Sequence, residues 1–172
     1  HLVMFAVAYS SCIAGLDAFP VQIELSHRAG EHDFTILGLG GAAVKESRER
    51  IISALECSGI DARGEILVNL APAEIKKESA AFDLPIALAL ACARGALPQA
   101  SLRDIAFCGE LSLAGEIRST VGITAHALAA AQRGLSTIVV PHSVASEAAV
   151  VRNLKVIGAK TLGEVIQILT GR

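Results

Sequence analysis

The segment Asp83–Ala93 constrains the fold more than any other part of the chain, because no charged side chain follows its first residue. Asp83 at the start and Pro85 in the first turn are typical of a helix N-terminus. A helix that is apolar on every side has to be enclosed by other elements. The segment therefore predicts a central, buried helix with Asp83 as its N-cap.

The composition indicates what surrounds this helix. Hydrophobic residues make up 52% of the 172 residues but aromatic residues only 3%, so Ala, Leu, Ile and Val must fill the core. Such a composition suits helices packed on a sheet, and the length fits one domain over residues 1–172. The four cysteines form no C-x-x-C pair and lie in apolar segments, which favours buried thiols in the cytoplasm over disulfides or zinc.

Local patterns predict the order of the elements. Val21–Ser26 and Phe34–Ile36 alternate around a turn-like segment and predict an antiparallel pair, with a strand over Leu2–Cys12 beside it. Further elements are expected as a helix over 42–58, a strand over 65–70, a hairpin over 105–118, a helix over 123–133, a strand over 137–140, a helix over 143–151, a strand over 155–157, and a last helix beginning at Thr161, which forms a capping box with Glu164. Antiparallel strands followed by βα alternation predict a single α+β or mixed α/β domain.

The first predicted helix carries five charged residues between Ala42 and Ile51. Glu46 faces Arg50 at the favourable i,i+4 spacing. Arg48 projects onto the flank of an apolar stripe formed by Val44, Ile51 and Leu55. This arginine has two interpretations: a long side chain that lies over the edge of the core on a solvated helix face, or part of a binding site.

Several classes of site find no support in the motifs. The glycines of Gly38–Gly41 have neither P-loop nor dinucleotide-binding spacing, so a tight strand-to-helix turn is expected there. His27, His32, His126 and His142 have no second ligand at metal spacing, and no metal is predicted. No apolar run reaches the ~18 residues of a membrane span, so no membrane contact is expected.

Charge leaves one local candidate for anion binding. The net charge of −2 provides no broad basic field, so a nucleic-acid contact requires a local patch or several copies of the chain. Lys76 and Lys77 precede the predicted buried helix, whose N-terminus offers unpaired N–H groups. The alternative is a solvent-exposed connection with surface lysines.

An ordered set of motifs carries a resemblance to a known family. These motifs are A-x-V-K-E-S-R-E-R from Ala42, V-N-L-A-P-A from Val68, K-E at Lys77 followed by F-D-L-P-I-A, G-E-L-S-L from Gly109, and G-E-I-R from Gly115. Together they resemble the N-terminal domain of the ComM/YifB magnesium-chelatase-like AAA+ proteins. The resemblance implies a Lon-protease-like domain of the ribosomal protein S5 domain 2-like fold, cut from a longer protein that contains an ATPase module.

The resemblance also implies that the Lon catalytic dyad is missing. The position of the Lon serine falls on Ala81, and the position of the Lon lysine falls on Thr124. Ser79 is two residues out of register, and no catalytic residue is expected. The chain departs from its own family as well, because the usual K-E-G-P-G-F-D-L becomes Lys77–Leu84 without the two glycines and the proline. This loss argues against a role that needs a special loop backbone.

The family resemblance implies a function in binding. The family is similar to a hexameric DNA helicase that promotes branch migration in natural transformation, and ATP and Mg²⁺ belong to the full-length protein, with no cofactor in this domain. The expected role is assembly into a ring and guidance of single-stranded or branched DNA. Contacts to DNA phosphates or to a neighbouring subunit are expected from Lys45, Arg48, Lys76, Lys77 and Arg118. The alternatives are a pure oligomerisation module, a residual Lon-type serine peptidase and a magnesium-chelatase-related subunit.

Overall fold

The computed structural model describes residues 2–75, 77 and 79–171. Within these residues a seven-stranded sheet has the order β3-β4-β2-β1-β5-β8-β9, and β6 pairs with β7 apart from it. The strands are β1 (Met4–Ala14), β2 (Asp17–Arg28), β3 (Asp33–Leu37), β4 (Glu65–Ala71), β5 (Ile105–Phe107), β6 (Glu110–Leu111), β7 (Ile117–Arg118), β8 (Thr137–Pro141) and β9 (Lys155–Ala159). The helices are α1 (Gly41–Cys57), α2 (Asp83–Ala93), α3 (Ile123–Gln132), α4 (Ala145–Ala148) and α5 (Leu162–Thr170), with 3₁₀ turns η1 (Ala80–Phe82), η2 (Gln99–Leu102) and η3 (His142–Val144).

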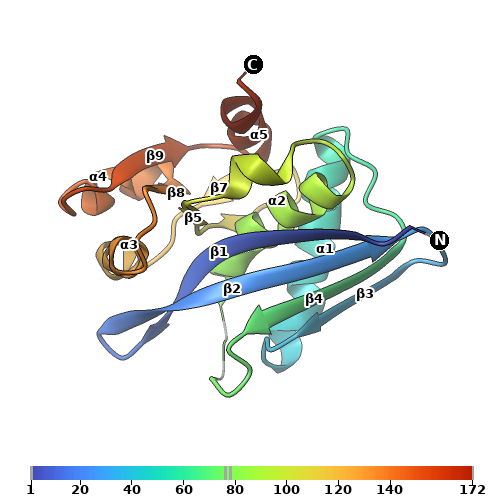
Figure 1. Cartoon of the computed structure of the whole chain (residues 1–172), viewed down its shortest axis with the longest axis horizontal. Coiled ribbons are helices and arrows are strands. Elements are labelled where there is room, and N and C mark those ends of the chain that lie inside the picture. Colours follow the sequence, from blue (N-terminus) through green and yellow to red (C-terminus); the bar gives the residue numbers. More distant parts are fainter. Residues whose placement is uncertain (1, 76, 78, 172) are drawn as a thin grey trace.

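The large sheet is mixed. β1 runs antiparallel to β2, and β2 runs antiparallel to β4. The remaining neighbours, β3 with β4, β1 with β5, β5 with β8 and β8 with β9, are parallel. Figure 1 shows the long β1–β2 hairpin in front of the helices, with the shorter strands β8 and β9 at the far side of the sheet. The predicted mixed α/β class is confirmed.

The predicted antiparallel pair of β2 and β3 is wrong. β4 lies between these strands: Ile23 of β2 pairs with Leu70, and Ile36 of β3 pairs with Val68 on the other side of β4. The connection from β3 to β4 runs through α1, and a helical crossover allows the two strands to be parallel. Alternation identified each strand correctly but contains no information on its neighbour.

The central helix α2 is buried at every residue, as its apolar sequence predicts. It packs against β1, β2 and α1, and its side chains belong to the main core. Asp83 is not its N-cap, however. Phe82 occupies that position and makes no side-chain cap, because the Asp83 carboxylate is used by other elements.

The C-terminal half also refines two predictions. The predicted hairpin over 105–118 is wrong for its first part, because β5 joins the large sheet between β1 and β8 and only β6 pairs with β7. The helix predicted over 143–151 is shorter, with η3 followed by α4. The cap at Thr161 is confirmed, since its Oγ1 accepts the Glu164 N–H at 3.0 Å.

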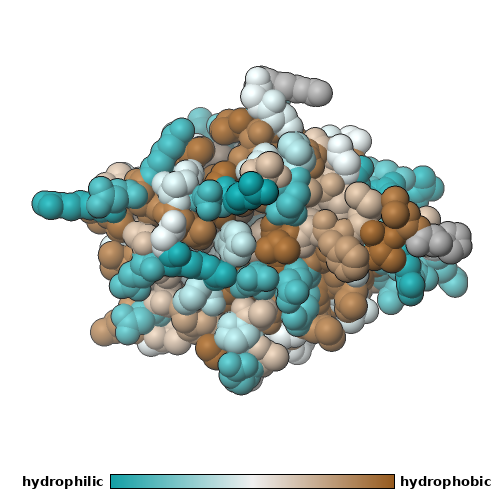
Figure 2. All heavy atoms as spheres, in the orientation of Figure 1, coloured by the Kyte–Doolittle hydropathy of each residue, from teal (hydrophilic) through white to brown (hydrophobic). Residues whose placement is uncertain are grey.

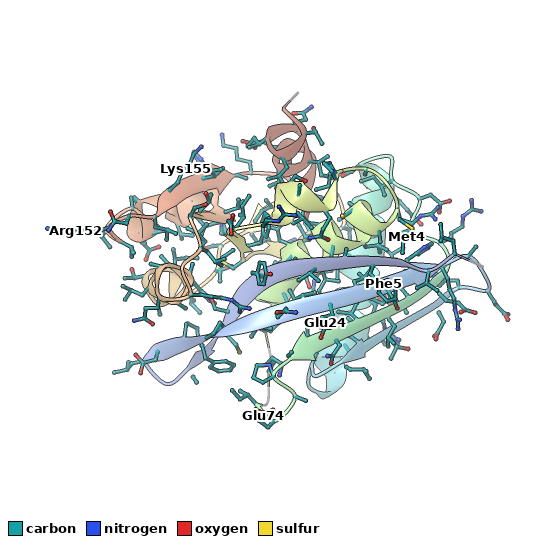
Figure 3. All side chains as sticks on the ribbon, in the orientation of Figure 1. Met4, Phe5, Glu24, Glu74, Arg152 and Lys155 are labelled. Carbon is teal, nitrogen blue, oxygen red and sulfur yellow. The ribbon has the colours of Figure 1, made fainter. Side chains whose placement is uncertain are left out.

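One face of the antiparallel half carries α1 and α2, and the opposite face carries α3 at one end only (Figure 1). The uncovered remainder of that face mixes hydrophilic and hydrophobic groups (Figure 2). Phe5, labelled in Figure 3, is 72% exposed there. The layers therefore enclose α2 completely but leave part of the sheet open.

Candidate functional site

A buried carboxylate joins α1, α2 and β6. Asp83 accepts hydrogen bonds from Arg50 Nε at 2.6 Å, from Ser47 Oγ at 2.8 Å and from the Leu111 N–H at 3.1 Å. The Asp83 side chain is fully buried, and a buried carboxylate requires such donors to offset the loss of hydration. We call Ser47, Arg50 and Asp83 the Asp83 hub.

Opposing influences act on the charges of this hub. Burial raises the pKa of the Asp83 carboxyl, while the hydrogen bonds from Arg50, Leu111 and Ser47 lower it. The hydrogen bond to Asp83 raises the pKa of Arg50, so the guanidinium stays charged. The predicted Glu46–Arg50 pair is present at 3.8 Å, but the closer Asp83 partner was not predicted. The hub therefore serves to hold three elements in place.

Arg48 lies over the edge of its own sheet. Its Nη1 donates to the backbone oxygen of Phe34 at 2.7 Å, and Phe34 belongs to the edge strand β3. The side chain is half-buried, as expected for a guanidinium on the flank of an apolar stripe. Arg48 thus satisfies a carbonyl of the edge strand.

A groove of about 500 Å³ separates α1 from β3 beside Arg48. It is lined by His32, Asp33, Phe34, Lys45, Arg48, Glu49, Ile52, Ser53 and Glu56. The acidic and basic side chains alternate around it, so the groove has no dominant positive charge. It brings Lys45 and Arg48 together, as the helical spacing requires.

The other predicted contact residues lie elsewhere. Lys77 is fully buried, and its Nζ donates to the backbone oxygens of Pro72 and Ile75. Its expected role in a DNA or subunit contact is wrong for this structure, because a buried ammonium held by carbonyls cannot reach a phosphate. Lys76 lies outside the described residues. Arg118 is exposed on β7, opposite Glu110 of β6.

The two positions that correspond to the Lon dyad are engaged in the fold. Ala81 is 5% exposed and packs in a core cluster with Ile123. Thr124 Oγ1 donates to the backbone oxygen of Glu147 at 3.1 Å. Ser79 Oγ accepts the N–H of Ala81 at 3.0 Å and begins the turn η1.

A buried polar pair that sequence reasoning missed fastens α3 to β1. Ser11 Oγ and His126 Nδ1 are 2.6 Å apart, and both side chains are buried. Burial lowers the pKa of His126 to about 4. No local pattern links two residues 115 positions apart, so only the fold could reveal the pair.

Neither metal ligation nor membrane insertion finds structural support. Among the residues that the structure describes, no group of three or more His, Cys, Asp or Glu side chains is placed to hold a metal ion. In the same part of the chain, no helix is both long and apolar enough to cross a bilayer.

The mixed sheet around a buried helix defines a magnesium-chelatase-like α/β domain. In agreement, residues 22–144 match the family model described as subunit ChlI of Mg-chelatase. Competence protein ComM of Haemophilus influenzae is 36% identical over 97% of this chain, and YifB of Escherichia coli is 35% identical over 78% of it. The chain belongs to the ComM/YifB family of magnesium-chelatase-like proteins.

Two further results define the extent of the likeness. The chain spans 33% of the length of the H. influenzae protein and 27% of the E. coli protein. A Lon protease of Syntrophomonas wolfei is 26% identical over 70% of this chain and is covered over 16% of its own length. The similarity to Lon is thus more distant than the similarity to ComM.

Proposed function

We propose that the chain is a non-catalytic accessory domain of a ComM/YifB-type hexameric AAA+ DNA helicase that acts in branch migration. In this role it serves ring assembly and guides single-stranded or branched DNA, while ATP and Mg²⁺ act in the rest of the longer protein. The observation that carries the proposal is the state of the dyad positions, Ala81 and Thr124. A methyl group cannot attack a carbonyl, and a threonine hydroxyl is no general base.

The exposed candidates assign contacts to two surfaces. Lys45 and Arg48 lie at the α1–β3 groove, and Arg118 lies on β7. Exposed cations of this kind gain affinity for DNA when several copies surround one strand, because each phosphate contact releases counterions. The same side chains can pair with carboxylates of a neighbouring copy.

Binding and assembly are tested separately. Fluorescence anisotropy with a single-stranded oligonucleotide measures DNA affinity, and sedimentation velocity measures association of the chain and of Arg48→Ala. A concentration-dependent oligomer that binds no DNA would leave only an oligomerisation module. A monomer that binds no DNA would contradict the proposal.

Catalysis is tested with a serine-directed acylating reagent. No labelling is expected, because Ser79 Oγ caps η1 and no Lon-like lysine stands at position 124. Stoichiometric labelling that disappears in Ser79→Ala would refute the non-catalytic assignment. It would support a residual peptidase instead.

A further inference from the structure

Three neighbouring strands begin at one end of the sheet. β5, β8 and β9 are parallel, and Ile105, Thr137 and Lys155 form a single row across them. Adjacent strands lie about 4.8 Å apart, so this row spans about 10 Å. Residues that precede these strands are therefore brought to one edge, although they are far apart in the sequence.

Cationic residues occupy this edge. Arg103 precedes β5 by two residues, Arg152 precedes β9 by three, and Lys155 is the first residue of β9. All three are exposed, and we call them the basic edge. Figure 3 shows Arg152 and Lys155 at the α4–β9 end of the molecule, away from the labelled Glu24 and Glu74.

The charge of the basic edge is not neutralised within the described part of the chain. There, no carboxylate lies within ion-pair distance of Arg103, Arg152 or Lys155. Other arginines do have such partners: Arg28, Arg50, Arg63 and Arg94 each pair with a carboxylate. Asp104 contributes one exposed negative charge beside Arg103, so the edge keeps a net positive charge.

A fourth cation extends the edge over the α3 face of the sheet. The Arg133 guanidinium lies 4.7 Å from the centre of the Tyr9 ring, and its Nη2 donates to Gln22 Oε1 at 3.5 Å. The turns of the edge also carry exposed Ser136 and Asn153, which are neutral hydrogen-bonding groups. Guanidinium groups with polar neighbours favour phosphate over an apolar partner.

We propose that the basic edge contacts consecutive phosphates of a nucleic-acid strand. This inference rests on the proposed function and assigns the DNA contact to the strand starts of β5, β8 and β9. The α1–β3 groove is less suited, because its acidic side chains oppose a polyanion. A row of separate cations, each free of a carboxylate partner, matches a linear array of phosphates.

The test compares two charge reversals of equal size. Arg152→Glu/Lys155→Glu changes the basic edge, and Arg118→Glu/Lys160→Glu changes an exposed arginine and lysine at the opposite end of β9, where Ile117 donates to the Lys160 carbonyl at 2.8 Å. Affinity for a fluorescent single-stranded oligonucleotide is measured between 50 and 200 mM salt. Circular dichroism checks that both variants are folded.

The basic-edge variant is expected to lose about tenfold or more in affinity, and the slope of log K against log salt is expected to fall by about 2. The matched variant is expected to retain wild-type affinity. Loss in the matched variant alone would overturn this inference and leave the proposed function standing. Absence of binding by the wild-type chain would overturn both.

Anionic phospholipid vesicles without nucleic acid provide the competing partner. No sedimentation of the chain with vesicles of phosphatidylserine and phosphatidylcholine is expected. Vesicle binding that depends on Arg152 and Lys155, together with unchanged oligonucleotide affinity, would overturn the assignment to nucleic acid.

Discussion

Protonation of His126 is expected to account for a large part of any loss of stability in mild acid. Burial lowers the pKa of this imidazole from its ordinary value of 6.5 to about 4 in the folded chain. Below pH 6.5 the unfolded chain therefore binds more protons at this site than the folded chain does. The stability that His126 provides is complete above about pH 6.5, is lost as the pH falls towards 4, and is constant below that.

The size of the effect follows from the shift. A difference of about 2.5 pH units, at about 1.36 kcal/mol for each unit, corresponds to about 3 kcal/mol. Such a change exceeds the effect of most surface titrations and is a large fraction of the stability of a single domain.

Urea unfolding at a series of pH values between 4 and 7 measures this term. Carboxylates also titrate in this range, so the informative quantity is the difference between wild type and His126→Gln. We expect the stability gap between the two to change by about 3 kcal/mol across the range in favour of the variant at low pH. His142→Gln, at an exposed histidine of η3, is the control. Parallel pH curves for wild type and His126→Gln would refute the reasoning, as would an NMR titration of the His126 ring near pH 6.5.

Three substitutions test the packing by denaturant unfolding. Asp83→Ala should cost about 3–5 kcal/mol, because it leaves the Arg50 charge partly buried without its carboxylate; a cost under 1 kcal/mol would show that the hub is not a main tie between its elements. Thr161→Ala should cost about 1 kcal/mol through the lost cap of α5, with the exposed Ser146→Ala as a neutral comparison. Gly38→Ala should be destabilising by more than 1 kcal/mol, since φ is +91° and an added Cβ would lie 2.7 Å from the Leu70 carbonyl oxygen; wild-type stability would contradict that geometry.

The prediction of contact residues succeeded only where it depended on one helix. The spacing of α1 placed Arg48 on the flank of the apolar stripe and Glu46 near Arg50, and both features are present. The buried position of Lys77 could not be predicted, because its carbonyl partners come from the conformation of the preceding loop. A lysine in a polar segment is ordinarily exposed, and nothing local indicates the exception.

Short-range chemistry in the sequence determined the elements of this protein. The apolar circumference of Asp83–Ala93 required a buried helix, alternation over 21–26 required a strand with one buried face, and Thr161 required a helix start. Each of these follows from a period of two or 3.6 residues or from the unpaired N–H groups at a helix end. Such patterns act over a few residues and survive any arrangement of the chain.

Only the tertiary structure decided which elements are neighbours. The crossover through α1 placed β4 between β2 and β3, and the enclosure of α2 brought Asp83 to Arg50. The parallel register of β5, β8 and β9 gathered Arg103 and Arg152 at one edge. These contacts join residues tens of positions apart, and their energy depends on burial and pairing that exist only once the whole sheet has formed.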